Sequence, residues 1–206
     1  MTKAYVETKG AAANAMAYYA RSDMVVVDMG INADMSGVPN LLDRNIAWGT
    51  KNIAQGPAMT RLEAIRSIET GIEIADEKAR EGYRVFTIGE MGISNTTSSA
   101  CILGAFNHWN AIEVTGRGTN ISDERLRHKI DVVQRAMDVN HPDPNDGLDV
   151  LSKVGGFEYG CMTGVILGAA ANHALTIIDG FNTTASAFIA KALCPEVVHY
   201  LMASHL

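Results

Sequence analysis

Three short apolar runs constrain the fold more than any other feature of this sequence. They are MVVVD at 24–28, VFTIG at 85–89 and LTIID at 175–179, and none of them alternates apolar with polar residues. Continuous apolar strands of this kind are typical of a parallel sheet that is buried on both faces. A fourth run, AIEVTG at 111–116, is a weaker strand candidate.

The segments between these runs have the patterns of helices. Thr60 and Glu63 form a capping box at the start of a helix predicted to reach Lys78. Further helices are expected over 96–107, 122–138, 146–155, 157–173 and 183–193, and after Pro195. This alternation predicts an α/β fold, Rossmann-like, with a mainly parallel sheet and helices on both faces. A length of 206 residues fits a single α/β domain over 1–206.

Charge and cysteine usage argue against two classes of function. A net charge of −6, with only 17 Lys and Arg, disfavours nucleic acid as a partner. The cysteines Cys101, Cys161 and Cys194 are odd in number and lack CxxC spacing. They are predicted to be reduced, mostly buried thiols of a cytoplasmic protein, and no metal site is expected.

The N-terminus and the longest apolar stretch do not have the pattern of membrane segments. The first 20 residues lack the basic and apolar regions of a secretory signal. The stretch at 161–178 is rich in Gly and Ala and is interrupted by Asn172 and His173. It is therefore predicted to be a buried helix followed by a buried strand rather than a membrane span.

Each predicted strand is followed by an acidic residue and a glycine. These pairs are Asp28 with Gly30, Glu90 with Gly92, and Asp179 with Gly180. Ligands of open α/β sheets bind at the carboxyl ends of the strands. A single pair is more simply a turn glycine and a helix-capping acid, but three pairs on one sheet edge favour a shared site.

The stretch GEMGISNTTSSA at 89–100 leads from the second strand into a helix that is predicted to begin near Asn95 or Thr96. Backbone N–H groups and the helix dipole at such an N-terminus suit a phosphate or a carboxylate. The hydroxyls of Thr96, Thr97 and Ser98 are further donors, although N-capping is their simpler interpretation. Neither a P-loop nor a dinucleotide fingerprint is present.

Glu90 and Lys129 are the two charged candidates for a role in a site at this stretch. Glu90 would repel a phosphate, so its position favours stabilising a cationic centre, orienting a nitrogen heterocycle or acting as a base. A second glycine turn, TGRGT at 115–119, is another candidate anion-binding loop and carries Arg117. Lys129 neutralises a phosphate if its helix face turns inward, but taken alone it is more typical of a solvated helix charge.

Five segments together resemble the nicotinate-nucleotide:dimethylbenzimidazole phosphoribosyltransferases. They occur in the family's order and cover nearly the whole chain from about residue 10: DRNIAWGTKNIAQGPAMTRLEA (43–64), GEMGISNTTSSA (89–100), TGRGT followed by LRHK (126–129), GGFEYGCMTGVILGAA (155–170) and IIDGFNTTASA (178–187). The resemblance implies a Rossmann-like enzyme of cobalamin biosynthesis, commonly a homodimer, that uses no metal or cofactor. It transfers phosphoribose from nicotinate mononucleotide to 5,6-dimethylbenzimidazole, which yields α-ribazole 5′-phosphate and nicotinate.

The resemblance also implies roles for particular residues. Glu90 matches the family's active-site glutamate, which helps to stabilise an oxocarbenium-like sugar. Lys129 matches a lysine that contacts the substrate. The other expected substrate-binding residues are in the two glycine turns, at the start of the helix and in the Asp-Gly-Phe turn: Met91, Gly92, Asn95, Thr96, Gly116, Gly118, Asp179 and Gly180.

The resemblance covers the central portion of the family. The family's C-terminal glycine-rich segment, with the glutamate usually assigned as general base, and about the first sixty residues of a typical member have no counterpart here. Ser94 stands where the family's turn commonly has a glycine. The alternative hypotheses are a non-catalytic nucleotide-binding fragment or partner subunit, and a transferase for another azole or a phenol. A homodimer or an exposed apolar patch is expected.

Overall fold

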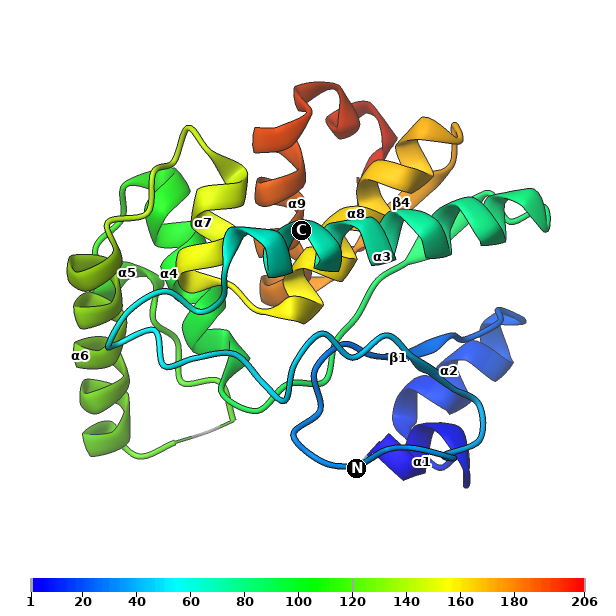
Figure 1. Cartoon of the computed structure of the whole chain (residues 1–206), viewed down its shortest axis with the longest axis horizontal. Helices are drawn as coiled ribbons and strands as arrows, with labels where there is room; N and C mark the ends of the chain where they lie inside the picture. Colours follow the sequence, from blue (N-terminus) through cyan, green and yellow to red (C-terminus); the bar gives the residue numbers. More distant parts are fainter. Residues whose placement is uncertain (1, 120, 206) are drawn as a thin grey trace. The chain divides into compact units, whose positions relative to one another are not determined.

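The computed structural model describes residues 2–119 and 121–205 (Figure 1). Contacts between residues divide the chain into two compact units, Met1–Gly49 and Thr50–Leu206, and each is described by itself. All residues of the predicted site fall in the second unit. The single domain expected over 1–206 stays a prediction.

The first unit contains two short helices and a two-stranded parallel sheet. The helices are α1 (Thr2–Val6) and α2 (Ala12–Ala20), and the strands are β1 (Val26–Asp28) and β2 (Leu41–Asp43). The carboxylate of Asp28 is buried and accepts hydrogen bonds from the backbone N–H groups of Gly30 and Ile31 at 2.9 and 2.8 Å. Asp28 therefore stabilises the turn that follows its own strand. An acid at the end of a strand has a structural role here, as in the simpler of the two interpretations given above.

The second unit is mostly helical and has one three-stranded sheet. Its elements are α3 (Arg61–Arg80), β3 (Val85–Thr87), α4 (Asn95–Asn107), α5 (Ala111–Val114), α6 (Asp123–Asn140), α7 (Gly147–Val154), α8 (Phe157–Ala171), β4 (Leu175–Ile178), α9 (Gly180–Leu193), the 3-10 helix η1 (Pro195–Tyr200) and β5 (Leu201–Ala203). The strand order is β3-β4-β5, and both pairings are parallel. The carboxyl ends of β3 and β4 therefore lie at the same sheet edge.

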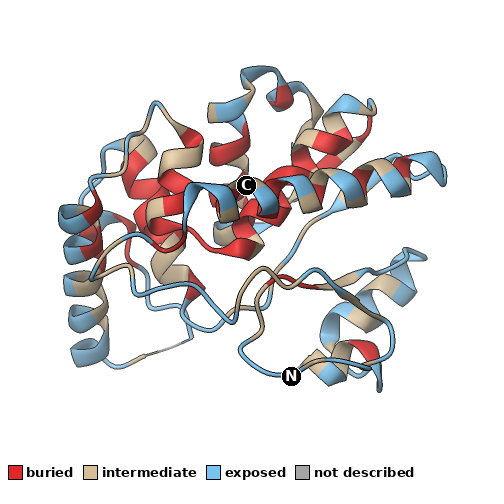
Figure 2. Cartoon of the chain, viewed as in Figure 1, coloured by how far each residue is buried: buried red, intermediate tan, exposed pale blue. Residues whose placement is uncertain are grey.

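Helix α8 packs directly on α3 because glycines line the contact. A Cβ added at Gly164 would lie 1.9 Å from the Ile68 carbonyl oxygen, and one at Gly160 would lie 1.8 Å from Ser67 Oγ. Figure 2 shows buried residues gathered where the helices of this unit meet, with α8 among the most buried. This packing fixes the first turn of α8, which borders the site described below.

Most predicted helices are confirmed, and their caps explain why. Thr60 Oγ1 accepts a hydrogen bond from the Glu63 N–H at 3.2 Å, and Glu63 Oε2 accepts one from the Thr60 N–H at 2.7 Å. The stretch at 161–178 is the predicted helix followed by a strand. No helix in the described part of the chain is long and apolar enough to cross a membrane.

Three features of the predicted sheet are wrong. The run at 24–28 pairs with β2 and does not join the sheet of β3 and β4. Strand β3 is not buried on both faces, since Val85 is 55% exposed. The run at 111–116 forms helix α5 instead of a strand, because Asn110 and Glu113 form a second capping box there.

The three cysteines are free thiols, as predicted. Cys101 and Cys161 are buried and Cys194 is partly exposed. Burial raises the pKa of the Cys101 and Cys161 thiols to about 12, so both remain protonated and unreactive near neutral pH.

Candidate functional site

A polar pocket lies at the carboxyl ends of β3 and β4. Its volume is about 290 Å³, and its lining comes from the loop after β3 and from the starts of α4 and α9: Ile88, Gly89, Glu90, Thr96, Asp179, Phe181, Asn182 and Thr183. Of the three predicted strand-end acids, Glu90 and Asp179 meet here. Asp28 belongs to the other sheet, so the prediction of three acids on one sheet edge is wrong.

Amide donors hold both oxygens of the Glu90 carboxylate. Asn182 Nδ2 donates to Glu90 Oε1 at 2.6 Å, and Asn95 Nδ2 donates to Glu90 Oε2. Asn182 Nδ2 also donates to Asn95 Oδ1 at 3.2 Å. Both oxygens of the side chain accept from amides, so this arrangement fixes the orientation of the Glu90 carboxyl group at the pocket.

One buried hydroxyl orients the Asn182 side-chain amide, and a second holds the backbone of Asn95. Ser99 Oγ donates to Asn182 Oδ1 at 2.7 Å, which leaves the Asn182 NH₂ group facing Glu90. The Tyr159 hydroxyl donates to the Asn95 backbone carbonyl at 2.8 Å and lies 2.7 Å from Ser99 Oγ. Burial raises the pKa of Tyr159, so it stays a neutral donor.

Sequence reasoning missed Asn182, Ser99 and Tyr159. Asn182 is the third residue of α9, and its partner Glu90 is 92 residues earlier in the chain. Its place in the IIDGFNTTASA segment, two residues after Gly180, is the signal that points to it.

Gly92 gives the Asn95 side chain its space. A Cβ at residue 92 would lie 2.7 Å from Asn95 Nδ2, closer than real contacts allow. Between them Ser94 has φ of 70°, a left-handed conformation that favours glycine. Met91, another predicted site residue, has a side chain that is 58% exposed and does not line the pocket.

Lys129 joins the second glycine turn to the start of α4. Its Nζ donates to Thr96 Oγ1 at 2.8 Å and to the Gly116 carbonyl at 3.1 Å. Lys129 is partly buried, and burial lowers its pKa. Gly118 lies beside Thr96 Oγ1 and Lys129 Nζ, and its φ is 65°. The predicted residues Thr96, Gly116, Gly118 and Lys129 are therefore together, whereas Arg117 pairs with Asp123 beside the loop.

Asp179 is exposed and is held at the sheet edge by residues that follow β5. Ser204 Oγ donates to Asp179 Oδ1 at 2.9 Å, and His205 Nδ1 lies 3.3 Å from the same oxygen. Gly180 begins α9 with φ of 79°, a conformation that side chains rarely adopt. The Asp-Gly turn thus brings the start of α9, and with it Asn182, up to Glu90.

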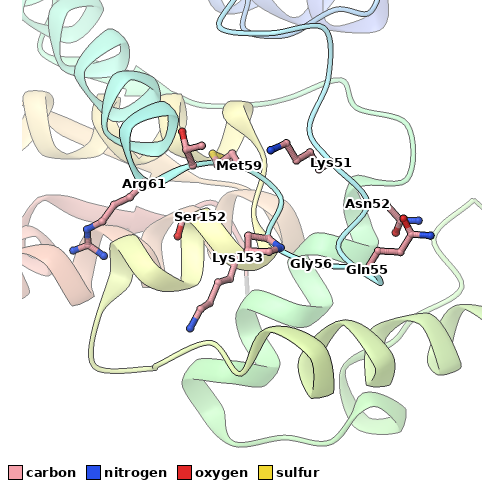
Figure 3. Close-up of a pocket in the computed structure, with 10 residues that line it drawn as sticks. Lys51, Asn52, Gln55, Gly56, Met59, Arg61, Ser152 and Lys153 are labelled. Carbon is pink, nitrogen blue, oxygen red and sulfur yellow. The ribbon is translucent and has the colours of Figure 1, made fainter.

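A larger pocket of about 630 Å³ lies elsewhere in the second unit, between the loop before α3 and the end of α7 (Figure 3). It has three basic side chains, but Arg61 pairs with Asp146 at 2.9 Å and Lys153 pairs with Asp149 at 2.9 Å. None of the predicted site residues lines it. We assign the chemistry to the smaller pocket because its acid is oriented by a dedicated hydrogen-bond network. Within the described residues, no three His, Cys, Asp or Glu side chains are grouped to hold a metal ion.

The fold is shared with proteins that are named phosphoribosyltransferases. The phosphoribosyltransferase family model matches residues 1–206, so the chain belongs to this family. It is 46% identical over 196 residues to the nicotinate-nucleotide–dimethylbenzimidazole phosphoribosyltransferase of Geobacter metallireducens. The aligned residues are 95% of this chain and 56% of the relative. It is 49% identical over 185 residues to the enzyme of that name from Clostridioides difficile. This alignment includes 90% of this chain and 53% of the relative.

A solved structure has the same fold. The crystal structure of CobT from Thermus thermophilus superposes on this chain with a TM-score of 0.94 and 36% sequence identity, over 100% of this chain and 61% of that one. The chain thus spans a little over half the length of the curated relatives it matches.

Proposed function

We propose that this chain takes part in phosphoribosyl transfer from nicotinate mononucleotide to 5,6-dimethylbenzimidazole, with release of nicotinate and formation of α-ribazole 5′-phosphate. The observation that carries the proposal is the Glu90 carboxylate, whose two oxygens are held by Asn95 and Asn182 at the mouth of a sheet-edge pocket. The relatives that carry the name of this activity support it.

Glu90 places a negative charge beside the reacting sugar. When nicotinate leaves, positive charge develops on the ribose, and a fixed carboxylate nearby stabilises that charge without reorganising. Asn95 and Asn182 keep Glu90 in one orientation in the absence of substrate. Nicotinate leaves from a pyridinium, so the reaction is proposed to need neither a metal nor a cofactor.

Lys129, Thr96 and the Gly116–Gly118 turn bind the 5′-phosphate in this proposal. Their groups meet at the N-terminus of α4, where backbone N–H groups and the helix dipole favour an anion. Lys129 Nζ has a neutral hydroxyl and a carbonyl as partners there, so a phosphate gives its charge a counter-ion.

The finer statements about the whole protein are also proposals. We propose a Rossmann-like arrangement with helices on both faces of the sheet, a cytoplasmic location and a homodimer. Met16, Tyr18 and Tyr19 on α2 have exposed side chains, and a partner surface would cover apolar side chains of this kind.

A second candidate is a subunit or fragment that binds the nucleotide without turnover. The match extends over 56% of the Geobacter metallireducens enzyme. A third candidate keeps the transfer chemistry and takes another azole or a phenol as acceptor.

One pair of measurements separates these candidates. Nicotinate mononucleotide is titrated into the purified chain by calorimetry, and nicotinate release is then followed with and without dimethylbenzimidazole. Acceptor-dependent release supports the transferase. Binding without release supports the non-catalytic candidate, and release that needs another azole or a phenol supports a changed acceptor. Absence of binding and release overturns the proposal.

A further inference from the structure

One of the five segments that resemble the family contributes no residue to the Glu90 pocket. This segment, 43–64, includes the loop before α3, and its residues 51–61 form most of the wall of the larger pocket (Figure 3). Each of the other four segments contributes to the network around Glu90 or to the contacts of Lys129. A volume of about 630 Å³ is within the range of small-molecule sites. The larger pocket therefore has the size of a binding site, and the proposed function does not use it.

Hydrogen bonds hold the backbone of this loop in place. The Lys51 N–H donates to the Ala58 carbonyl at 2.8 Å, which closes the loop on itself. The Ala58 N–H donates to the Lys153 carbonyl at the end of α7 at 3.0 Å. Asn140 Nδ2, at the end of α6, donates to the Ile53 carbonyl at 2.7 Å. The walls of the larger pocket are therefore preformed, which is typical of ligand sites.

The lining of the larger pocket is rich in hydrogen-bond donors. Three of its side chains are basic, and no carboxylate of the described residues lines it. Lys51 Nζ has no hydrogen bond or ion pair to another described residue. The Thr60 hydrogen bonds and, to a lesser degree, the Lys51 charge lower the pKa of Glu63, whose carboxylate is held in the capping box. Asn52 and Gln55 add side-chain amides to the lining.

The other two basic side chains have donors to spare. Arg61 Nη1 donates to Asp146 Oδ2 at 2.9 Å, which occupies only one of the guanidinium N–H donors. Lys153 Nζ lies 2.9 Å from Asp149 Oδ2 and donates to the His141 carbonyl at 3.0 Å, which leaves one ammonium proton. Both aspartates lie outside the lining. A ligand that matches these walls supplies acceptors and negative charge.

We propose that the larger pocket is a second binding site, which takes a phosphate monoester of a small molecule. A phosphate offers more acceptor oxygens than a carboxylate, and the free donors come from more than one wall. Lys51 and Arg61 neutralise its charge. Asn52 and Gln55 donate to the polar body of the ligand, and Pro57 gives that body an apolar surface. This site does not depend on the proposed phosphoribosyl transfer.

Gly56 provides a way to fill the pocket without disturbing its walls. It lines the pocket, and a Cβ there meets no atom within 4 Å, so a larger side chain extends into open space. Gly56→Leu should therefore occupy part of the volume and keep the melting temperature of the wild type.

The test titrates adenosine 5′-monophosphate by calorimetry into the wild type, Lys51→Ala, Gly56→Leu and the control Lys129→Ala. The wild type is expected to show a binding event that Lys129→Ala retains. Lys51→Ala should weaken it by about 10-fold or more, and Gly56→Leu should abolish it. Adenosine, which lacks the phosphate, should bind at least about 10-fold more weakly. Inorganic phosphate should compete with adenosine 5′-monophosphate but bind more weakly.

Several results would overturn the proposal. They are no binding of adenosine 5′-monophosphate by the wild type, affinity that is unchanged in Lys51→Ala and Gly56→Leu, and binding that is lost in Lys129→Ala alone, which would put the ligand at Lys129. Equal affinity for adenosine, or for inorganic phosphate, overturns the phosphate ester as the ligand. If Gly56→Leu does not fold, Lys51→Ala decides alone against Lys191→Ala, an exposed lysine of α9.

Discussion

Asn182 Nδ2 lies 2.6 Å from Glu90 Oε1, which links the start of α9 to the turn after β3. The two residues follow neighbouring parallel strands, so the sheet edge brings them together. Ser99 keeps the Asn182 amide in the orientation that donates.

Asn182→Ala tests whether this bond orients the acid. It leaves one oxygen of a partly buried carboxylate without its donor, so we expect the free energy of unfolding to fall by about 1–3 kcal/mol. Nicotinate release should fall by about 10-fold or more because Glu90 is no longer fixed. Asn172→Ala is the control, since Asn172 donates to Asp76 at 2.6 Å, away from the site. An equal loss of release in both variants would contradict an orienting role.

Lys129→Ala tests the phosphate site. Loss of a charge-assisted hydrogen bond should weaken binding of nicotinate mononucleotide by about 1.5–3 kcal/mol. Because burial lowers the pKa of Lys129, the wild type should lose affinity with rising pH earlier than an exposed lysine would cause. Calorimetry with Lys191→Ala, an exposed lysine of α9, is the control. Unchanged affinity in Lys129→Ala would make Lys129 a structural lysine.

Gly92→Ala tests the space that Asn95 needs. The new Cβ would lie 2.7 Å from Asn95 Nδ2 and should displace the amide from Glu90. We expect a loss of about 1–3 kcal/mol in stability, together with reduced nicotinate release. Gly56→Ala is matched to it, because a Cβ there meets no atom within 4 Å. Denaturant unfolding of both variants measures the difference, and equal stabilities would refute the steric argument.

Ser94→Gly should stabilise the chain. Ser94 has φ of 70°, and a left-handed non-glycine residue costs about 1–2 kcal/mol, part of which is offset by the greater freedom of glycine in the unfolded chain. We expect a net gain of about 1 kcal/mol in urea unfolding. Glu69→Gly, at an exposed position within α3, should instead destabilise by up to about 1 kcal/mol. A destabilised Ser94→Gly would show that the serine makes a compensating contact.

The sequence predicted the helices well because their signals are local. The Thr60–Glu63 capping box is readable without any knowledge of the fold, and the structure confirms it. At 111–116 a strand-like run and the capping box of Asn110 and Glu113 give opposite signals, and the structure has a helix there. Strands β2 and β5 were not predicted because their residues, LLD and LMA, lack the β-branched side chains that mark the other runs.

The sheet and the site depend on contacts between distant residues. The apolar run at 24–28 has the pattern of a buried parallel strand, but its pattern does not specify its partner, which is β2. Glu90 could be predicted because it follows a strand in the GEMG turn and matches the active-site glutamate of the family that the sequence resembles. Asn182, Ser99 and Tyr159 were not, since their importance comes from hydrogen bonds that only the folded chain brings together.

Glu90→Gln tests the central claim most directly, because it removes the charge and keeps the size of the side chain. Nicotinate release at saturating nicotinate mononucleotide and dimethylbenzimidazole is measured for both proteins, together with nucleotide affinity. We predict a loss of turnover of about 100-fold or more, with affinity within about threefold of the wild type. Equal turnover in the two proteins, or no release by the wild type, would contradict the account.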